Sequence, residues 1–458
     1  MELSPENIIG DLAERWEVSP DGKVITFYLH QGVRWHDGQP FTADDVVYSI
    51  NKILDPERSV IYDSFPALQY AFKVDAYTVE LHLKYASPSI LSQLAGPYAV
   101  MEAAHYQYAD PKSTNFLMGT GPFKFKNYTE PVEYELVKND DYFKEGLPYL
   151  DGVKMSIITN RSTQVDVLVA NRVDMGPGSI AYREIEQIER IVDEAPSVII
   201  QPVAYPYSRG FWANMDYAPL QDVRVRRALS LLMDPEEVVM AGWGSPDFGW
   251  TGKAIFPAPW NLPEKEIAEI MWWDRPFEER IAEAQRLMVE AGYPDGFPLR
   301  MVSRNRSDAE RVLTVVADNW RRHINIQPEI LMREVSDAMS MRNAGDFDLY
   351  WETLYAMTGD MDEYISIFLT DGGSNYGGYS NPALDKLLNE QSVTMDFAKR
   401  QQLAHEIERI TLTDLSVLPG SIFFTFVQAW QPYVKGYVPG GSGYSQAHLR
   451  MENIWLDK

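Results

Sequence analysis

The sequence predicts a protein of the α/β class, and three observations support this prediction. Between residues 299 and 331, strand-like segments at 299–302 and 324–331 enclose a helix-like segment at 312–320. Alternation of strands and helices is typical of α/β folds. Near the N-terminus, residues 12–54 combine a strand pattern with a helix pattern. The length of 458 residues is enough for two or three domains, each with its own core.

The N-terminal segment carries the densest local signals. Residues 24–29 alternate between two faces, and a period of two predicts a half-buried strand. Thr42 stands three residues before Asp45, which is an acidic variant of the capping box, and apolar residues follow at helical spacing. Residues 74–83 alternate again and predict a further strand, with a turn near Tyr77 and Thr78. We therefore expect a sheet with a capped helix in this part of the chain.

Other helices are predicted from their first and last residues. Asp222 is expected to cap one helix, and Asp234 another that begins at Pro235, because proline at the first helical position loses no hydrogen bond. Residues 277–291 have an amphipathic pattern, and Gly292 is expected to end that helix because glycine readily adopts a positive φ.

The composition excludes several classes of function. The chain has 66 acidic and 41 basic residues and a formal net charge of -25, which disfavours a partner as negatively charged as nucleic acid. It has no cysteine, and so no disulfide framework, thiolate metal site or cysteine nucleophile. No apolar run approaches the roughly 20 residues that span a bilayer, and the first residues lack the pattern of a signal peptide.

Several long stretches resemble a known family. They are LAERWEVSPDG, TFYL and GVRWHDGQPFTADDVVYSI near the N-terminus, then KVDAYTVELHL, GTGPFKFKNY and DDYFKEGLPYLDGV, and later PLQDVRVRRALSLLMDPEEVV. Together they resemble the family 5 extracytoplasmic solute-binding proteins, which deliver oligopeptides, some oligosaccharides and nickel complexes to ABC importers. The resemblance implies an α/β, two-lobed, type II periplasmic-binding-protein-like fold with an extra α/β subdomain on the first lobe.

The resemblance also implies a division of the chain into four ranges. We expect residues 1–118 to form the extra subdomain, 119–245 the first lobe, 246–427 the second lobe, and 428–458 a C-terminal return to the first lobe. Members of the family carry an export signal and a first strand ahead of the part that resembles this chain. The chain is therefore expected to be N-terminally incomplete and to act in the periplasm or another extracytoplasmic compartment.

The function implied by the resemblance is that of a receptor. A monomer would capture an oligopeptide-like solute in a cleft between its lobes by hinge closure, and would deliver it to the permease subunits of an ABC transporter. An oligosaccharide or another polar, non-peptide solute is the alternative ligand. A hydrolase with paired carboxylates and a chaperone-like surface protein are alternatives from other classes.

Candidate ligand-binding residues follow from the same resemblance. The stretch FDLYWETLYAMTGDMDEYISIF aligns with the pattern of the peptide receptors, and Met357 takes the place of their amine-binding aspartate. Because a buried ammonium needs a counter-charge, this loss should weaken binding of a free N-terminus. Asp360 is a nearby substitute. Arg342 corresponds to an arginine that faces the ligand in some receptors, or is a surface arginine. Asn214 corresponds to an asparagine beside the cleft, or holds a turn.

Aromatic side chains are further candidates, since they make up 12% of the chain and sugar rings stack on them. Most of them are expected to lie in the core. The candidates for ligand contact are Trp212 and Trp351, and those for stacking also include Trp243, Trp250, Trp272 and Trp273.

No pattern of residues indicates catalysis, a metal or a cofactor. The seven histidines show no ligand spacing, and His30 and His36 merely flank one turn. Asp360, Asp362 and Glu363 do not have the spacing of a known calcium loop. We therefore expect a protein that is not an enzyme.

Overall fold

The computed structural model describes residues 8–59, 61, 64–96, 99–106, 117–176, 185–204, 208–245, 249–250, 255–354, 359–419, 423–439 and 450–458. The chain forms two compact units. The first, called here the 202–426 unit, consists mainly of Pro202–Phe426. The second, called here the terminal unit, consists of Ser4–Tyr182, Gln187–Gln201 and Val427–Lys458.

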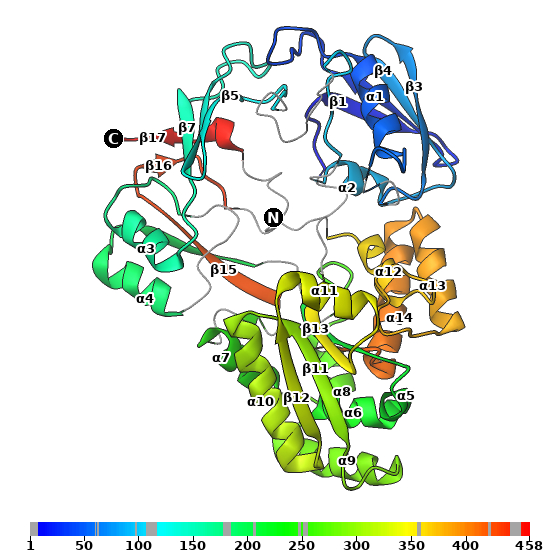
Figure 1. Ribbon diagram of the computed structural model, residues 1–458. Coiled ribbons are helices and arrows are strands. Elements are labelled where there is room, and N and C mark those ends of the chain that lie inside the picture. The colour runs from blue at the N-terminus through cyan, green and yellow to red at the C-terminus, as the bar shows by residue number, and fades with distance from the viewer. Residues whose placement is uncertain are drawn as a thin grey trace. The chain divides into compact units, whose positions relative to one another are not determined.

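The terminal unit begins with a four-stranded antiparallel sheet of order β1-β2-β4-β3. Helix α1 packs on strands β3 and β4. Alternate strand residues point into the core between sheet and helix, where Trp35, Phe41, Ile50 and Leu81 are buried. The elements are β1 (Ala13–Val18), β2 (Val24–Leu29), α1 (Ala43–Ile53), β3 (Leu68–Asp75), β4 (Thr78–Leu83) and α2 (Ile90–Leu94) (Figure 1).

Two local predictions for this region can be compared with the structure. Strand β2 and the capping box of α1 are confirmed, since the backbone N–H of Thr42 donates to Asp45 Oδ2 over 2.8 Å. The single strand predicted at 74–83 is wrong, because the chain reverses between β3 and β4. The carboxylate of Asp75 accepts the backbone N–H of Tyr77 over 2.8 Å and so stabilises a turn within the predicted strand.

The rest of the terminal unit contains a three-stranded antiparallel sheet of order β5-β6-β7 and a two-stranded sheet, β16-β17. A small core near the C-terminus contains the buried residues Trp430, Val434 and Ile454. The elements are β5 (Phe123–Thr129), β6 (Glu133–Lys138), β7 (Gly152–Ser156), α3 (Arg161–Val169), α4 (Ile185–Glu194), β16 (Val434–Lys435), the short 3-10 helix η6 (Met451–Asn453) and β17 (Trp455–Leu456). Strands β8 (Ile199–Ala204) and β15 (Phe423–Trp430), and the first turn of α4, contain points at which the two units divide.

The 202–426 unit is built on a five-stranded sheet of order β12-β11-β13-β9-β14. Strand β11 runs parallel to β12 and β13, whereas β9 is antiparallel to β13 and β14. The strands are β9 (Ser208–Ala213), β11 (Pro298–Arg304), β12 (Gln327–Arg333), β13 (Leu349–Leu354) and β14 (Val417–Pro419), and the short β10 (Gly249–Trp250) pairs with β15.

Helices surround this sheet (Figure 1). They are α5 (Ala218–Gln221), α6 (Val223–Leu231), α7 (Pro235–Trp243), α8 (Glu264–Met271), α9 (Phe277–Glu290), α10 (Ser307–Ile324), α11 (Val335–Asn343), η4 (Met361–Tyr364), α12 (Ile365–Phe368), α13 (Pro382–Val393) and α14 (Phe397–Asp414). The predicted starts of α6 after Asp222 and of α7 after Asp234 are confirmed, as is Gly292 beyond the end of α9, with a φ of 87°.

The two faces of the sheet pack against different helices. Successive strand residues point to opposite faces, so Tyr350 and Trp351 of β13 lie on different sides. On one side the ring of Phe211 contacts Trp351 and also Trp320 of α10. On the other side Tyr350 lies in a core with Ala338 of α11. Both faces of the central strands are therefore buried.

The observed units do not follow the four predicted ranges. Strand β9 and helices α5 to α7 lie within 119–245, yet they belong to the 202–426 unit. The assignment of the four ranges to lobes and a subdomain stays a prediction.

Candidate functional site

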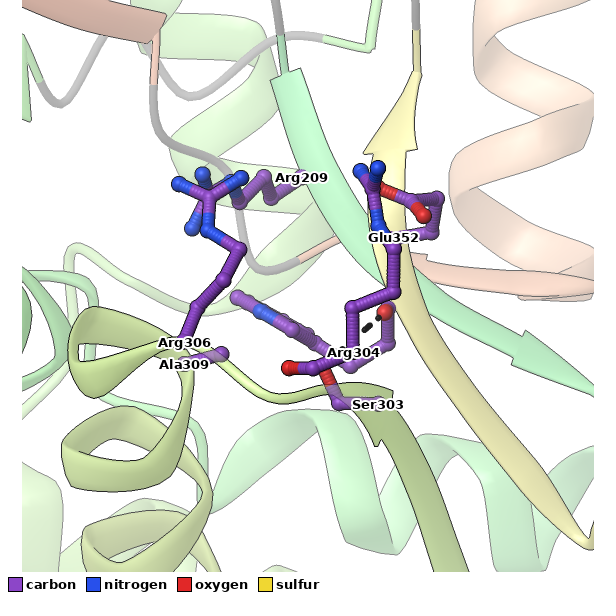
Figure 2. A pocket seen from close by; sticks show the side chains of 7 residues that line it. Arg209, Ser303, Arg304, Arg306, Ala309 and Glu352 are labelled. Carbon is purple, nitrogen blue, oxygen red and sulfur yellow. Dashed lines mark hydrogen bonds and ion pairs between the residues drawn. The ribbon is translucent and has the colours of Figure 1, made fainter. Parts of the chain in front are cut away.

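A small hollow lies where strands β11 and β13 end (Figure 2). In α/β sheets, ligands commonly bind beyond the carboxyl ends of the parallel strands. Arg304 is the last residue of β11, and Arg209 lies opposite Thr353 in the pairing of β9 with β13. The residues that line the hollow, called here the arginine hollow, are Arg209, Ser303, Arg304, Arg306, Ala309, Trp351 and Glu352.

Carboxylates hold the arginines in place. Asp308, in the first turn of α10, accepts hydrogen bonds from Arg209 over 2.7 Å and from Arg306 over 2.8 Å. Figure 2 shows the side chains of Arg209 and Arg306 next to each other and the guanidinium of Arg304 against Glu352. The distance from Arg304 Nη2 to Glu352 Oε1 is 2.5 Å. The Arg209–Asp308 and Arg304–Glu352 pairs join different strands or helices, so the fold fixes these two arginines. Arg306 pairs with a residue only two positions along the chain.

Charge pairing dominates the electrostatics of these five side chains. Three guanidinium groups lie against two carboxylates, and Arg209 and Arg304 have further interactions. Burial opposes ionisation of Asp308, but Arg209 and Arg306 outweigh it and hold the pKa of Asp308 below its ordinary value. Burial also lowers the pKa of the Arg209 guanidinium, against the effect of Asp308. An arginine remains protonated in such a setting, so all three guanidinium groups stay charged.

Trp351, a predicted ligand-binding residue, belongs to the arginine hollow. Its side chain is buried, and the ring centroid lies 4.7 Å from that of Phe211. Its indole Nε1 has no hydrogen-bond partner among the residues that the structure describes. A buried donor without a partner is unfavourable by about 1–3 kcal/mol, so an acceptor brought by a ligand would be stabilised there.

Three other predicted residues lie near one another on the opposite face of the sheet. Trp212 is buried, and its ring centroid lies 6.0 Å from that of Tyr376. The guanidinium carbon of Arg342 lies 4.1 Å from the centroid of the same tyrosine ring. Asn214 donates to the carbonyl oxygens of Gly345 and Phe347, over 3.0 Å and 2.8 Å, and so ties the end of α11 to the sheet.

These contacts bear on the two predicted roles of Asn214, a position beside the ligand cleft and the stabilisation of a turn. Both bonds use its amide donors, and its side-chain oxygen accepts the backbone N–H of Asp216 over 2.9 Å. The side chain therefore holds a turn, and its role in ligand binding stays a prediction. Arg342 is half-buried at the end of α11, so it is neither a fully exposed surface residue nor part of the core.

Asp360 lies in a different, buried cluster. Its two carboxylate oxygens accept hydrogen bonds from Arg400 Nη1 and Nη2, over 2.9 Å and 2.5 Å, and both side chains are 2% exposed. Asp362 and Gln391 complete the arrangement around Arg400. Because the charge of Asp360 is already compensated inside the protein, this pairing argues against its predicted role as a counter-charge for a ligand amine.

The remaining residues predicted for the site include Met357, Trp250 and Trp243. Met357 lies outside the described residues, as does the side chain of Trp250. Trp243 is buried beside Arg209, whose guanidinium carbon lies 5.6 Å from the ring centroid.

Among the described parts of the chain, no group of three or more histidine, aspartate or glutamate side chains could hold a metal ion. In the same parts, no helix has the length and apolar character needed to cross a membrane.

Sequence reasoning missed the arginine hollow and Tyr376. A signal for the hollow was present, since Arg304, Arg306 and Arg311 stand between a predicted strand at 299–302 and a predicted helix at 312–320. In an α/β unit, that position lies at the edge where ligands bind. No comparable signal existed for Tyr376, which follows a bend in a loop rich in glycine.

The fold and the site together define a class of protein. A sheet edge with fixed arginines and adjacent aromatic side chains is suited to holding a polar or anionic small molecule. The chain belongs to the family described as "Bacterial extracellular solute-binding proteins, family 5 Middle", whose profile matches residues 7–376.

Individual proteins agree with this assignment. The chain is 26% identical over 451 residues to the periplasmic oligopeptide-binding protein OppA of Salmonella typhimurium, covering 93% of this chain and 81% of that protein. It is 26% identical to heme-binding protein A of Haemophilus influenzae, covering 94% and 82%. The crystal structure of the ABC transporter substrate-binding protein CtaP of Listeria monocytogenes has a TM-score of 0.84 at 23% identity, over 98% and 90% of the two chains. The predicted family and fold class, α/β with the two-lobed architecture of periplasmic binding proteins, are confirmed.

Proposed function

We propose that this chain is the substrate-binding receptor of an ABC importer and captures an oligopeptide-like solute outside the cytoplasmic membrane. Family membership over most of the chain is the observation that carries this proposal. A monomer binds the solute, closes by a hinge motion, and is then recognised by the permease subunits. Hinge closure makes the loaded receptor differ in shape from the empty one, which a transport partner needs in order to respond to loading.

The arginine hollow supplies an anchor for an anionic group of the solute. Guanidinium groups bind carboxylates through paired N–H donors of fixed geometry, and charge-assisted hydrogen bonds are about twice as strong as neutral ones. Arg306 is the most accessible of the three arginines, with 28% of its side chain exposed. We propose that a carboxylate of the solute, such as the C-terminus of a peptide, is held near Arg306.

The names of the relatives do not fix the ligand class. One binds oligopeptides and another binds heme, so the same family serves different ligands. Anionic carboxylates occur in both of these ligands, which is consistent with an arginine anchor. Trp212 and Trp351 are 3% and 2% exposed, so neither offers an open ring face on which a sugar could stack. Trp212 and Trp351 are therefore weak candidates for stacking, whereas Trp272 and Trp273 are half-buried.

The first experiment identifies the solute and tests the receptor function. Native mass spectrometry of the gently purified full chain is expected to detect a co-purified solute that carries a carboxylate. Addition of trialanine to ligand-free protein is expected to reduce the radius of gyration in small-angle X-ray scattering. The absence of any bound solute, together with an unchanged radius of gyration for trialanine and longer peptides, would contradict the proposal.

The same samples separate a receptor from a hydrolase. A receptor returns the peptide unchanged after prolonged incubation, whereas a hydrolase with paired carboxylates releases amino acids. Chromatography of the incubated peptide is the measurement. Enzyme-dependent release of alanine from trialanine would favour the hydrolase.

A further inference from the structure

The loop between α12 and α13 carries Tyr376 in a fixed position. The side-chain amide of Asn375 donates to the carbonyl oxygens of Leu369 over 3.0 Å and of Tyr379 over 2.7 Å, and so closes the loop on itself. Its oxygen accepts the backbone N–H of Tyr379 over 3.1 Å. Thr370 is in turn bonded to Asp385 of α13. The loop is therefore braced from within and against the helix that follows it.

The loop is also attached, on the two sides of Tyr376, to strand β9 and to the residues that follow this strand. Before the tyrosine, the carbonyl oxygen of Ser374 accepts the indole N–H of Trp212 over 3.2 Å. After it, the carbonyl oxygen of Gly377 accepts the backbone N–H of Met215 over 2.8 Å. A Cβ atom at Gly377 would lie 2.2 Å from the carbonyl oxygen of Ala213, so the close approach requires glycine.

The ring of Tyr376 lies between Trp212 and Arg342. The guanidinium carbon of Arg342 is 4.1 Å from the ring centroid, which is well within the range of a cation–π contact. Because the ring is held by the anchored loop, the contact restricts the long arginine side chain. A guanidinium that stacks on a ring keeps its N–H donors in the plane of the group, where they remain able to bind an acceptor.

Arg342 forms no ion pair with a carboxylate among the described residues. Two of its N–H groups donate to the side-chain oxygen of its neighbour Asn343, each over 3.1 Å. The positive charge of Arg342 is therefore not paired with a carboxylate of the described residues, and its half-buried side chain can contact a solute.

Tyr350 adds a second donor at the same place. It lies opposite Trp212 in the pairing of β13 with β9, and its hydroxyl has no hydrogen-bond partner among the described residues. The side chain is fully buried. Burial and Glu352 raise the pKa of Tyr350 to about 12, so the hydroxyl stays protonated. The charge of Arg342 lowers this pKa, which shows that the two side chains interact electrostatically. An acceptor placed near Arg342 could also accept a hydrogen bond from this hydroxyl.

We propose that Tyr376 is a positioning residue that holds the guanidinium of Arg342 toward a second anionic group of the solute. On this basis the receptor prefers peptide-like solutes with an acidic side chain in addition to the carboxylate held by the arginine hollow. The inference rests on the proposed function, since it assigns a specificity to the same receptor. In this proposal, Tyr376 determines the preference for a solute with an acidic side chain and is not required for binding itself.

The test compares acidic peptides with isosteric neutral ones. Three tripeptides of alanine with one glutamate, at the first, second or third position, are titrated calorimetrically into the full chain, beside the three peptides with glutamine instead. The wild type is expected to bind at least one glutamate peptide about tenfold more tightly than its glutamine counterpart, because a charge-assisted hydrogen bond is lost in the neutral peptide. Arg342→Gln and Tyr376→Leu are expected to abolish this preference, whereas Tyr376→Phe keeps the ring and retains it.

The possible outcomes are distinguishable. Equal affinities for glutamate and glutamine peptides in the wild type would overturn the inference and leave the receptor function intact. No binding of any of the six peptides would contradict the proposed function, and the inference with it. A preference that is lost in Arg342→Gln but kept in Tyr376→Leu would show that Tyr376 does not position the arginine. If Tyr376→Leu fails to fold, the same decision rests on Tyr376→Phe and Tyr376→Met.

Discussion

The 202–426 unit contains two clusters of arginines and carboxylates that are built from the same groups and differ in balance. In the first, Arg400 is enclosed by Asp360 and Asp362, and the Arg400 and Asp360 side chains are each 2% exposed. In the second, the arginine hollow, three arginines share two carboxylates, and Arg304 and Arg306 are 21% and 28% exposed. The first cluster is closed to ligands, whereas the second has a partly exposed guanidinium group at Arg306.

This comparison distinguishes charged side chains that stabilise the fold from charged side chains that can bind a ligand. A buried arginine held by several protein groups stabilises the packing around it, and here Gln391 and the ring of Trp260 also contact Arg400. A partly exposed arginine at a sheet edge has donors left for a solute. Substitutions in the first cluster should therefore affect folding, and substitutions at the exposed margin of the second should affect binding.

The largest effect is expected from opening the closed cluster. Asp360→Ala leaves the buried Arg400 without its main counter-charge, and such a loss destabilises a protein by about 3–5 kcal/mol. Denaturant unfolding of the variant measures the change. Asp337→Asn, at an exposed position of α11, is the control and should leave stability nearly unchanged. A loss of less than about 1 kcal/mol for Asp360→Ala would show that the cluster is not a structural element.

A carboxylate buried without an arginine sharpens the comparison. Glu408 accepts the backbone N–H groups of Ile255 over 2.8 Å, Phe256 over 3.2 Å and Leu262 over 2.5 Å. Burial nevertheless raises the pKa of Glu408 from its ordinary value of 4.5 to about 7. The folded state therefore holds a proton that the unfolded state releases between these two pH values, and stability falls as the pH rises through this window.

Glu408→Gln removes this dependence, because the amide does not titrate. Relative to the variant, the wild type should lose up to about 3 kcal/mol of stability between about pH 5 and about pH 8. Denaturant unfolding of both proteins across this range provides the data. Parallel pH profiles for the two proteins would mean that Glu408 ionises as it does in the unfolded chain.

Within the arginine hollow, Asp308 is expected to have an intermediate effect on stability. Asp308→Asn removes the negative charge between Arg209, whose side chain is 5% exposed, and Arg306, and should destabilise the protein by about 1–3 kcal/mol. Since the pKa of Asp308 is lowered in the folded state, its contribution is present above the ordinary pKa and is lost as the pH falls below it.

The variant should accordingly be less sensitive to acid than the wild type. Acid unfolding followed by circular dichroism, with Asp318→Asn on the exposed side of the same helix as the control, tests this expectation. An acid transition of Asp308→Asn that coincides with that of the wild type would contradict it.

The smallest effect on stability is expected at the margin of the hollow. Arg306→Gln removes one partly exposed member of an ion pair, so unfolding should change by less than about 1 kcal/mol. Arg322→Gln, which is more exposed on α10, is the matched control. A destabilisation of Arg306→Gln as large as that of Asp360→Ala would remove the contrast between the two clusters.

Local structure was predictable from the sequence where neighbouring residues determine it. The capping box at Thr42 and Asp45 and the cap at Asp234 depend on residues within one helical turn, and both predictions are confirmed. The strand at 74–83 failed because alternation continues across a tight turn, which the hydrogen bond from Tyr77 to Asp75 helps to stabilise.

The candidate site was only partly predictable, because its contacts link distant parts of the chain. Asp360 was chosen for its nearness to Met357, yet its partner Arg400 lies 40 residues further on. Arg209 and Asp308 are separated by 99 residues, and no local pattern relates them. Arg342 was predicted from a resemblance, whereas its contact with Tyr376 depends on a loop that the strand β9 holds in place.

The arginine hollow as an anchor for a carboxylate is tested most directly by calorimetric titration of trialanine and of trialanine amide into the wild type and Arg306→Gln. The wild type should bind the free acid at least about tenfold more tightly than the amide, and Arg306→Gln should lose most of this difference while Arg322→Gln keeps it. Equal affinities of the wild type for the acid and the amide would contradict the account.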